Sequence, residues 1–124
     1  MFRKHLIGVD WQAIESGTTG LGIPDLNGCV GGVEFWIEMK ATTSWRLRIS
    51  PQQVGWAERR ARSGGRVFLA ARAIGKARDD LWLYSGRVIR GLVTQRLDQV
   101  PCLGHWSCGP AHWDWGQVRT LLTV

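Results

Sequence analysis

Alternation of apolar and polar side chains is clearest between Val33 and Lys40, in the segment VEFWIEMK. A period of two is typical of a strand with one buried face, so this segment is predicted to be a β-strand. The residues from Ile23 to Val30 predict a shorter strand, and Gly31 and Gly32 stand between the two. A Gly-Gly pair between two strands favours a tight turn, so we expect an antiparallel hairpin.

A strong helix-start signal follows this hairpin. Ser50 is expected to be the N-cap, Pro51 the first helical residue and Gln53 the third, which is the S-x-x-Q form of the capping box. Gly64 and Gly65 are expected to end the helix. Two more helices are predicted, one from Arg3 to Glu15 with Leu6, Val9 and Ile14 as its apolar face, and one from Trp115 to Val124 with Asp114 as its cap.

More strands are predicted after the central helix. Val67 to Ala73 (VFLAARA) is strongly apolar, Leu81 to Ser85 (LWLYS) predicts a further strand, and Gly75 to Asp80 reads as the polar turn between them. The segment from Arg87 to Leu97 fits either a strand or a helix. This order of elements predicts one α/β domain, residues 1–124, with a mixed central sheet flanked by helices.

The distribution of charged residues along the sequence indicates what kind of partner the protein binds. The formal charge is +6, and residues 41–96 carry twelve basic and three acidic side chains. Thirteen of the sixteen basic residues are arginines, whose planar fork suits phosphate oxygens, so a polyanionic partner is indicated. The solvated surface of a basic protein explains the same charge. No apolar run approaches the roughly 20 residues of a membrane helix, and no signal-peptide pattern is present, so we expect a cytoplasmic protein without a membrane partner.

Three charged residues of the predicted hairpin form the main candidate site. Glu38 and Lys40 are two positions apart on a strand and leave the same face, while Ile37 and Met39 are expected to face the core. If Asp25 lies on the neighbouring strand, its carboxylate meets that of Glu38. Two converging carboxylates favour a cation between them, and hard oxygen ligands select Mg²⁺ or Mn²⁺. A metal with a lysine beside it can hydrolyse a phosphodiester, although a plain surface ion-pair cluster is the alternative.

The segments Gly22-Ile23-Pro24-Asp25, Trp36-Ile37-Glu38-Met39-Lys40 and Ser50-Pro51-Gln52-Gln53 resemble the PD-(D/E)xK nuclease superfamily. Within it they are most similar to the VRR-NUC group of virus-type replication and repair nucleases, which has relatives among phage proteins. The resemblance covers Glu15 to Arg72, and the part beyond about Ala77 (77–124) matches nothing. The resemblance implies a restriction-endonuclease-like core. It also implies that the protein acts in the cytoplasm of a bacterial or phage-infected cell.

The same resemblance implies roles for individual residues. Asp25, Glu38 and the backbone carbonyl of Met39 would bind the metal, and Lys40 would act on the nucleophile or the developing charge. Glu15, on the first helix, would be a further metal ligand, and Gln53 a further catalytic residue. Each of these two has a plain alternative, a solvated carboxylate for Glu15 and a purely structural capping-box role for Gln53. The glycine-rich segment from Ser16 to Gly22 either admits a nucleic acid backbone or is an ordinary connection.

A cysteine–histidine cluster near the end of the chain is a separate candidate site. Cys102, His105, Cys108 and His112 have the pattern C-x2-H-x2-C-x3-H, which brings four zinc-type ligands into eleven residues. The order differs from common zinc fingers, and the ligands are unusually close together. The alternative to a structural zinc is a simple apolar cap formed around Trp106 and Trp113.

The sequence thus predicts a Mg²⁺-dependent endodeoxyribonuclease that acts on branched, junction or flapped DNA. Holliday junction resolvases, which share the core of the family that these motifs resemble, act as symmetric dimers. One protomer supplies only one cutting site, so a homodimer is expected here. Two alternatives remain, a non-catalytic nucleic-acid-binding module on the same fold and a zinc-stabilised interaction protein. Contacts to DNA phosphates are expected from five arginines, namely Arg46, Arg48, Arg59, Arg62 and Arg66.

Overall fold

The computed structural model describes residues 1–15 and 22–124, and its described part contains a six-stranded sheet with the strand order β1-β2-β3-β4-β5-β6. β3 and β4 are parallel, and all other neighbours are antiparallel. The predicted mixed central sheet flanked by helices is therefore confirmed. The strands are β1 (Asp10–Ala13), β2 (Leu26–Val30), β3 (Val33–Thr42), β4 (Val67–Gly75), β5 (Arg78–Ser85) and β6 (Gly104–Trp106).

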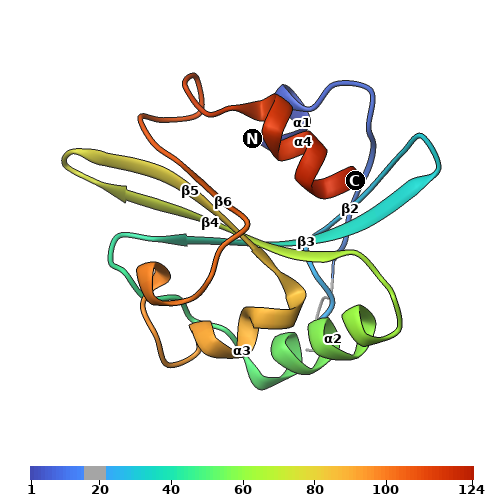
Figure 1. Ribbon diagram of the computed structural model, residues 1–124, viewed down its shortest axis with the longest axis horizontal. Helices are drawn as coiled ribbons and strands as arrows, with labels where there is room; N and C mark the ends of the chain where they lie inside the picture. Colours follow the sequence, from blue (N-terminus) through green and yellow to red (C-terminus); the bar gives the residue numbers. More distant parts are fainter. Residues whose placement is uncertain (16–21) are drawn as a thin grey trace.

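Helices cover both faces of this sheet (Figure 1). α1 (Phe2–His5) and α4 (Trp115–Thr123) lie on one face, and α2 (Pro51–Arg62) and α3 (Ile89–Leu92) lie on the other. Each face has its own apolar core. The first core joins α1 and α4 to the sheet and includes Phe2, Phe35, Ile37, Trp113 and Leu122. The second joins α2 and α3 to the sheet and includes Val54, Leu69, Tyr84, Ile89 and Leu92.

The predicted hairpin is present, and its register places the candidate site. Gly31 and Gly32 have φ values of +57° and +79°, the left-handed conformation that a two-residue hairpin turn of this kind requires. The ladder between the strands runs from Val30 opposite Val33 to Leu26 opposite Ile37. β2 thus begins later than predicted, while β3 continues to Thr42. The last residues of β3 therefore pair with β4 but not with β2.

The central helix begins as the sequence predicts. The Ser50 side chain accepts a hydrogen bond from the Gln53 backbone N–H, and the Gln53 side chain accepts one from the Ser50 backbone N–H. Pro51 is the first helical residue, and Gly64, with φ of +90°, follows the end of α2. Because the capping box fixes the first turn, the position of the Gln53 side chain is tied to the start of the helix.

The predicted helix from Arg3 to Glu15 is wrong. α1 ends at His5, the chain turns through Gly8 at φ of +86°, and Asp10–Ala13 forms β1 against β2. The side chain of Trp11 packs edge-on against Phe35, with ring centroids 5.6 Å apart. Pairing with a sheet edge and aromatic packing have outweighed the weak helical periodicity of this segment.

The C-terminal half was predicted in part. β4 and β5 are longer than expected, so their connection is a tight hairpin, and α4 is capped by Asp114 as predicted. The ambiguous segment is helical, and it comprises η1 (Gly86–Val88), α3 and η2 (Leu97–Gln99). The short edge strand β6 was not predicted. No helix in the described ranges is both long and apolar enough to cross a membrane.

Candidate active site

The candidate site lies where β2 and β3 separate. Asp25 is one residue before β2, directly beyond the last paired residues Leu26 and Ile37, and this places it opposite Glu38. Its carboxylate accepts a hydrogen bond of 2.9 Å from the backbone N–H of Met39. A side chain therefore takes the place of the missing β2 backbone. Pro24 is buried beside it and restricts the backbone that leads into Asp25.

The direction of the β3 backbone brings a carbonyl to the same place. The N–H of Trp36 donates to the carbonyl of Arg66, at the start of β4. In a strand successive peptide groups point to opposite sides, so even-numbered residues of β3 face β4 and odd-numbered ones face β2. The carbonyl of Met39 therefore points toward the side on which Asp25 lies, where the resemblance expects a ligand. The Met39 side chain is not in the core as expected but 36% exposed, because the apolar layer beneath β3 ends at Ile37.

Glu38, Lys40 and Gln53 form a connected polar network beside Asp25. Gln53 Nε2 donates to Glu38 Oε1 at 2.8 Å, and Lys40 Nζ donates to Gln53 Oε1 at 3.0 Å. Lys40 Nζ also lies 3.6 Å from Glu38 Oε1, as an ion pair. The same Gln53 side chain thus closes the capping box and also contacts the two strand residues, and its catalytic role stays a prediction.

Glu38 is the electrostatically unusual member of this group. Its side chain is only 7% exposed, and its Oε2 atom is buried without a hydrogen-bond partner. Burial, and after it the charge of Asp25, raise the pKa of Glu38 from an ordinary value of 4.5 to about 7, although Lys40 acts in the opposite direction. A buried carboxylate with one unpaired oxygen and a second carboxylate beside it is costly without a counter-ion.

A hard divalent cation fits this arrangement. The unpaired Glu38 Oε2, the Asp25 carboxylate and the Met39 carbonyl are oxygen donors of the type that Mg²⁺ and Mn²⁺ prefer. Within the described part of the chain, no three His, Cys, Asp or Glu side chains lie close enough together to hold a metal ion. The protein would therefore supply two side-chain ligands and leave the remaining positions to water and substrate, as is usual for Mg²⁺.

The other predicted metal ligands are not brought into such a group. Glu15 is exposed and follows β1 without regular secondary structure, rather than lying on a helix, because the first helix ends early. The cysteine–histidine cluster is also dispersed. Cys102 and Cys108 are exposed thiols, and His105 stacks on Trp82 and bonds Asp80 through Nε2 at 3.1 Å. His112 is exposed as well, so the four side chains do not meet in the described structure. The glycine-rich segment from Ser16 to Gly22 lies outside the described residues, apart from Gly22.

The five arginines expected on DNA have different surroundings. Arg66 is not available as expected, because its guanidinium donates to the carbonyls of Leu121, Leu122 and Val124 at the end of α4. Arg46 is partly engaged, since its Nη1 donates to the carbonyl of Thr94 at 2.6 Å. The other three are exposed, with Arg48 in the β3–α2 connection and Arg59 and Arg62 on α2.

Sequence reasoning missed the residues that support the site from the C-terminal half. Trp45, in the β3–α2 connection, lies beneath the guanidinium groups of Arg78 and Arg96, which are 4.6 and 4.9 Å from its ring centroid. Its carbonyl accepts a hydrogen bond from the N–H of Leu97. These partners are more than thirty residues away in the chain, and no local pattern signals such contacts.

Comparison with known proteins gives limited information. No protein-family description matches the chain, and no curated protein matches it. Among solved structures, the chain is similar to Hjc from Archaeoglobus fulgidus, described as a Holliday junction resolvase from an archaeal hyperthermophile, with 20% sequence identity and a TM-score of 0.48. The similarity covers 64% of this chain and 61% of the resolvase. The geometry of the site, rather than this similarity, is therefore the basis for a functional conclusion.

Proposed function

We propose that this protein is a metal-dependent DNA endonuclease of the PD-(D/E)xK type, most similar to the VRR-NUC group. The observation that supports this best is the unpaired, buried Oε2 of Glu38 beside the Asp25 carboxylate. A carboxylate pair of this kind gains most from a divalent cation, and Glu38 is contacted by Lys40 through an ion pair and by Gln53 through a hydrogen bond. Carboxylates, a lysine and a divalent cation together suffice to hydrolyse a phosphodiester.

Each side chain has a distinct task in this proposal. Asp25, Glu38 and the Met39 carbonyl would hold Mg²⁺ or Mn²⁺, which supplies Lewis acidity and lowers the pKa of bound water. Lys40, whose side chain is 20% exposed, offers N–H donors to an attacking water or to a phosphate oxygen that gains charge. Gln53 holds both Glu38 and Lys40, and so fixes the distance between the carboxylate and the ammonium group.

The proposed substrate is DNA with a branch, junction or flap. The protein carries a formal charge of +6, and exposed arginines lie on the α2 side of the sheet, where the site also is. A single protomer supplies a single carboxylate pair. Cutting of two strands related by symmetry therefore requires a homodimer, and a dimer with a twofold axis is part of the proposal.

The test is a cleavage assay on linear, flapped and four-way-junction DNA with Mg²⁺, Mn²⁺ or EDTA. Cutting should require the metal and should be lost in Glu38→Ala and Lys40→Ala. Glu34→Ala is the matched control, because Glu34 is an exposed glutamate on the same strand outside the network. Activity retained in either site variant would refute the assignment. Binding of DNA without cutting under every condition would instead favour a non-catalytic nucleic-acid-binding module.

A further inference from the structure

A groove adjoins the candidate active site at the C-terminal end of β3. It has a volume of about 550 Å³, and its lining includes Lys40, Thr42, Thr43, Ser44, Arg46 and Arg48. Lys40 belongs both to this groove and to the network with Glu38 and Gln53. A ligand that reaches Lys40 can therefore continue directly into the groove.

The groove is suited to a negatively charged ligand. Its lining contains three cationic residues and no acidic one. Arg48 is exposed and makes no hydrogen bond or ion pair with another side chain in the described part of the protein. Its five N–H donors therefore remain available to an incoming phosphate.

Two of the three hydroxyl groups that line the groove, those of Thr42 and Ser44, are already used within the loop. Thr42 Oγ1 donates to the carbonyl of Arg46 at 2.9 Å and accepts from the N–H of Ser44. Ser44 Oγ accepts from the N–H of Arg46 at 3.1 Å. These bonds shape the loop, so a ligand would be held by the cationic side chains rather than by these two hydroxyls.

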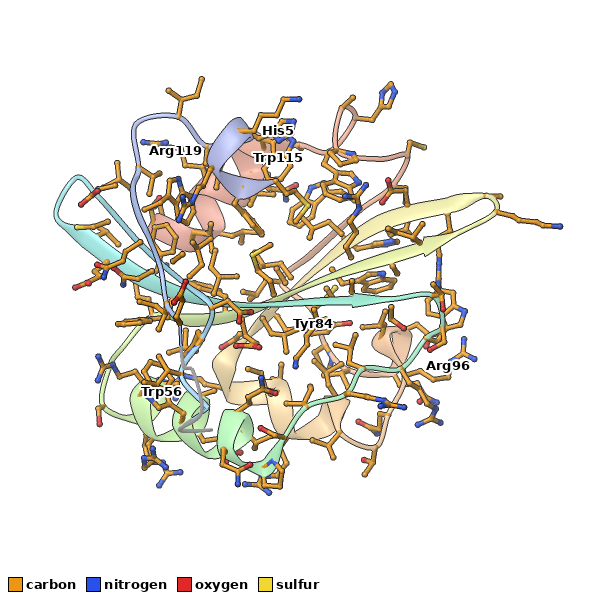
Figure 2. The ribbon with its side chains drawn as sticks, turned by 180° about the vertical axis from the view of Figure 1, so that it is seen from behind. His5, Trp56, Tyr84, Arg96, Trp115 and Arg119 are labelled. Atoms are coloured by element: carbon orange, nitrogen blue, oxygen red, sulfur yellow. The ribbon has the colours of Figure 1, made fainter. Side chains whose placement is uncertain are left out.

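The loop is also fixed from outside. Besides the contacts of Trp45 with Arg78 and Arg96, Arg78 Nη2 donates to the carbonyl of Ser44 at 2.8 Å. Arg46 is anchored to the carbonyl of Thr94. Figure 2 shows Arg96 at the opposite end of the molecule from Trp56 of α2, so this support is separate from the arginines of the helix. A preformed loop loses little conformational entropy when it binds a ligand.

We propose that this groove is a phosphate subsite that holds the DNA backbone directly beside the scissile phosphate, with Arg48 as the residue that binds it. The inference rests on the proposed function and extends it by naming the path of the substrate strand. The occupant is a nucleic acid strand, because the groove continues from the residue expected at the scissile phosphate and its charge complements a chain of phosphates. Arg46 acts mainly as a positioning residue for the loop.

The first test measures binding of DNA in EDTA, where no cutting occurs. Binding of a labelled four-way junction is followed by fluorescence anisotropy at several salt concentrations. Arg48→Ala should reduce the slope of log K against log salt by about one, as expected for the loss of one phosphate contact. Arg48→Lys should keep the slope. Arg3→Ala is the matched control, because Arg3 is exposed on α1 at the other face of the sheet.

The second test locates the contact by replacing single phosphates of the DNA with neutral methylphosphonates. When the phosphate next to the cleaved one is replaced, the wild-type protein should lose the contact that Arg48→Ala already lacks. The wild type and Arg48→Ala should then bind this DNA with equal affinity. An unchanged salt slope in Arg48→Ala, or a difference that persists at every neutral position, would overturn the subsite. If the wild type cuts DNA but the salt slope of Arg48→Ala is unchanged, the subsite is excluded and the nuclease assignment stands. If the salt slope of Arg48→Ala is reduced but the wild type cuts no DNA, the nuclease assignment is excluded and the groove remains a nucleic-acid-binding site.

Discussion

Gln53 Nε2 donates a 2.8 Å hydrogen bond to Glu38 Oε1, and this bond links the first turn of α2 to the middle of β3. The other end of the same amide accepts from Lys40 and from the Ser50 backbone. A helix-capping group and the candidate catalytic pair are therefore coupled through one side chain. Variants that separate these functions can show what each contributes.

Ser50→Ala removes half of the capping box but leaves the bond between Gln53 and Glu38. We expect a loss of about 1 kcal/mol in the free energy of unfolding and only a small change in kcat. Gln53→Ala should cost similar stability but also lower kcat by at least tenfold, because Glu38 and Lys40 lose their common partner. Urea unfolding and single-turnover cleavage measure the two effects. Equal activity in both variants would limit Gln53 to a structural role.

The pKa of Glu38 predicts a pH dependence of stability. Because its pKa is raised to about 7 in the folded protein, the folded state keeps a proton that the unfolded chain releases above its ordinary value of 4.5. The free energy of unfolding in EDTA should therefore fall as the pH rises from 4.5 to 7. Glu38→Gln, which keeps the acceptor for Gln53, should remove this fall and be more stable than the wild type at pH 8 by roughly 1–3 kcal/mol.

The same proton should compete with the metal. Binding of Mg²⁺ or Mn²⁺ requires the ionised carboxylate, so metal affinity should rise between pH 6 and pH 8 and a proton should be released on binding. Calorimetry in buffers of different ionisation enthalpy counts that proton. A metal affinity that does not change over this range would contradict a ligand role for Glu38.

Gly22 lies against the start of α2 and should not tolerate a side chain. A Cβ at this position would come 2.2 Å from the carbonyl oxygen of Gln52, and its φ of +75° disfavours other residues. Gly22→Ala should therefore both destabilise the protein and displace the first turn of α2. Gly64→Ala separates the two causes, because Gly64 has φ of +90° with open space around it and should show only the backbone cost of about 1 kcal/mol. Thermal unfolding and cleavage of both variants provide the comparison, and equal losses would exclude the clash.

Arg66 should behave as a structural residue. Its three hydrogen bonds to the carbonyls at the end of α4 suggest that Arg66→Ala lowers stability by about 1–3 kcal/mol. The salt slope of DNA binding should stay unchanged, in contrast to Arg48→Ala. A reduced slope together with unchanged stability would restore the role expected from the sequence.

The strongest local signals in the sequence were the reliable ones. The Gly-Gly turn, the alternation along β3 and the capping box at Ser50 predicted the elements that carry Glu38, Lys40 and Gln53, because each signal depends only on neighbouring residues. The early helix failed because a tertiary edge pairing decided the conformation of residues 10–13. The later start of β2, which leaves Asp25 to bond the Met39 N–H, was also beyond a local pattern.

Charge alone was a poorer guide to which arginines are available to a ligand. All of the chosen arginines look alike in sequence, but Arg66 is committed to α4 and Arg46 to Thr94, whereas Arg48 is exposed in the groove. The difference comes from partners at distant positions in the chain. A cluster of basic residues therefore indicates the kind of ligand but not the side chains that contact it.

Trp45 is held by Arg78, Arg96 and Leu97, and these contacts limit which fragments of the chain can keep the site intact. All four site residues lie between positions 25 and 53, yet the loop beside them takes its shape from a strand and helices encoded much later. A fragment that ends after β4 would keep every chemical group of the site and the residues that line the groove, but it would lose the contacts that hold the β3–α2 loop in place. The four site residues are close together in the sequence, but the loop beside them depends on residues far away in the chain. Transfer of the site to another protein would therefore require those distant residues as well.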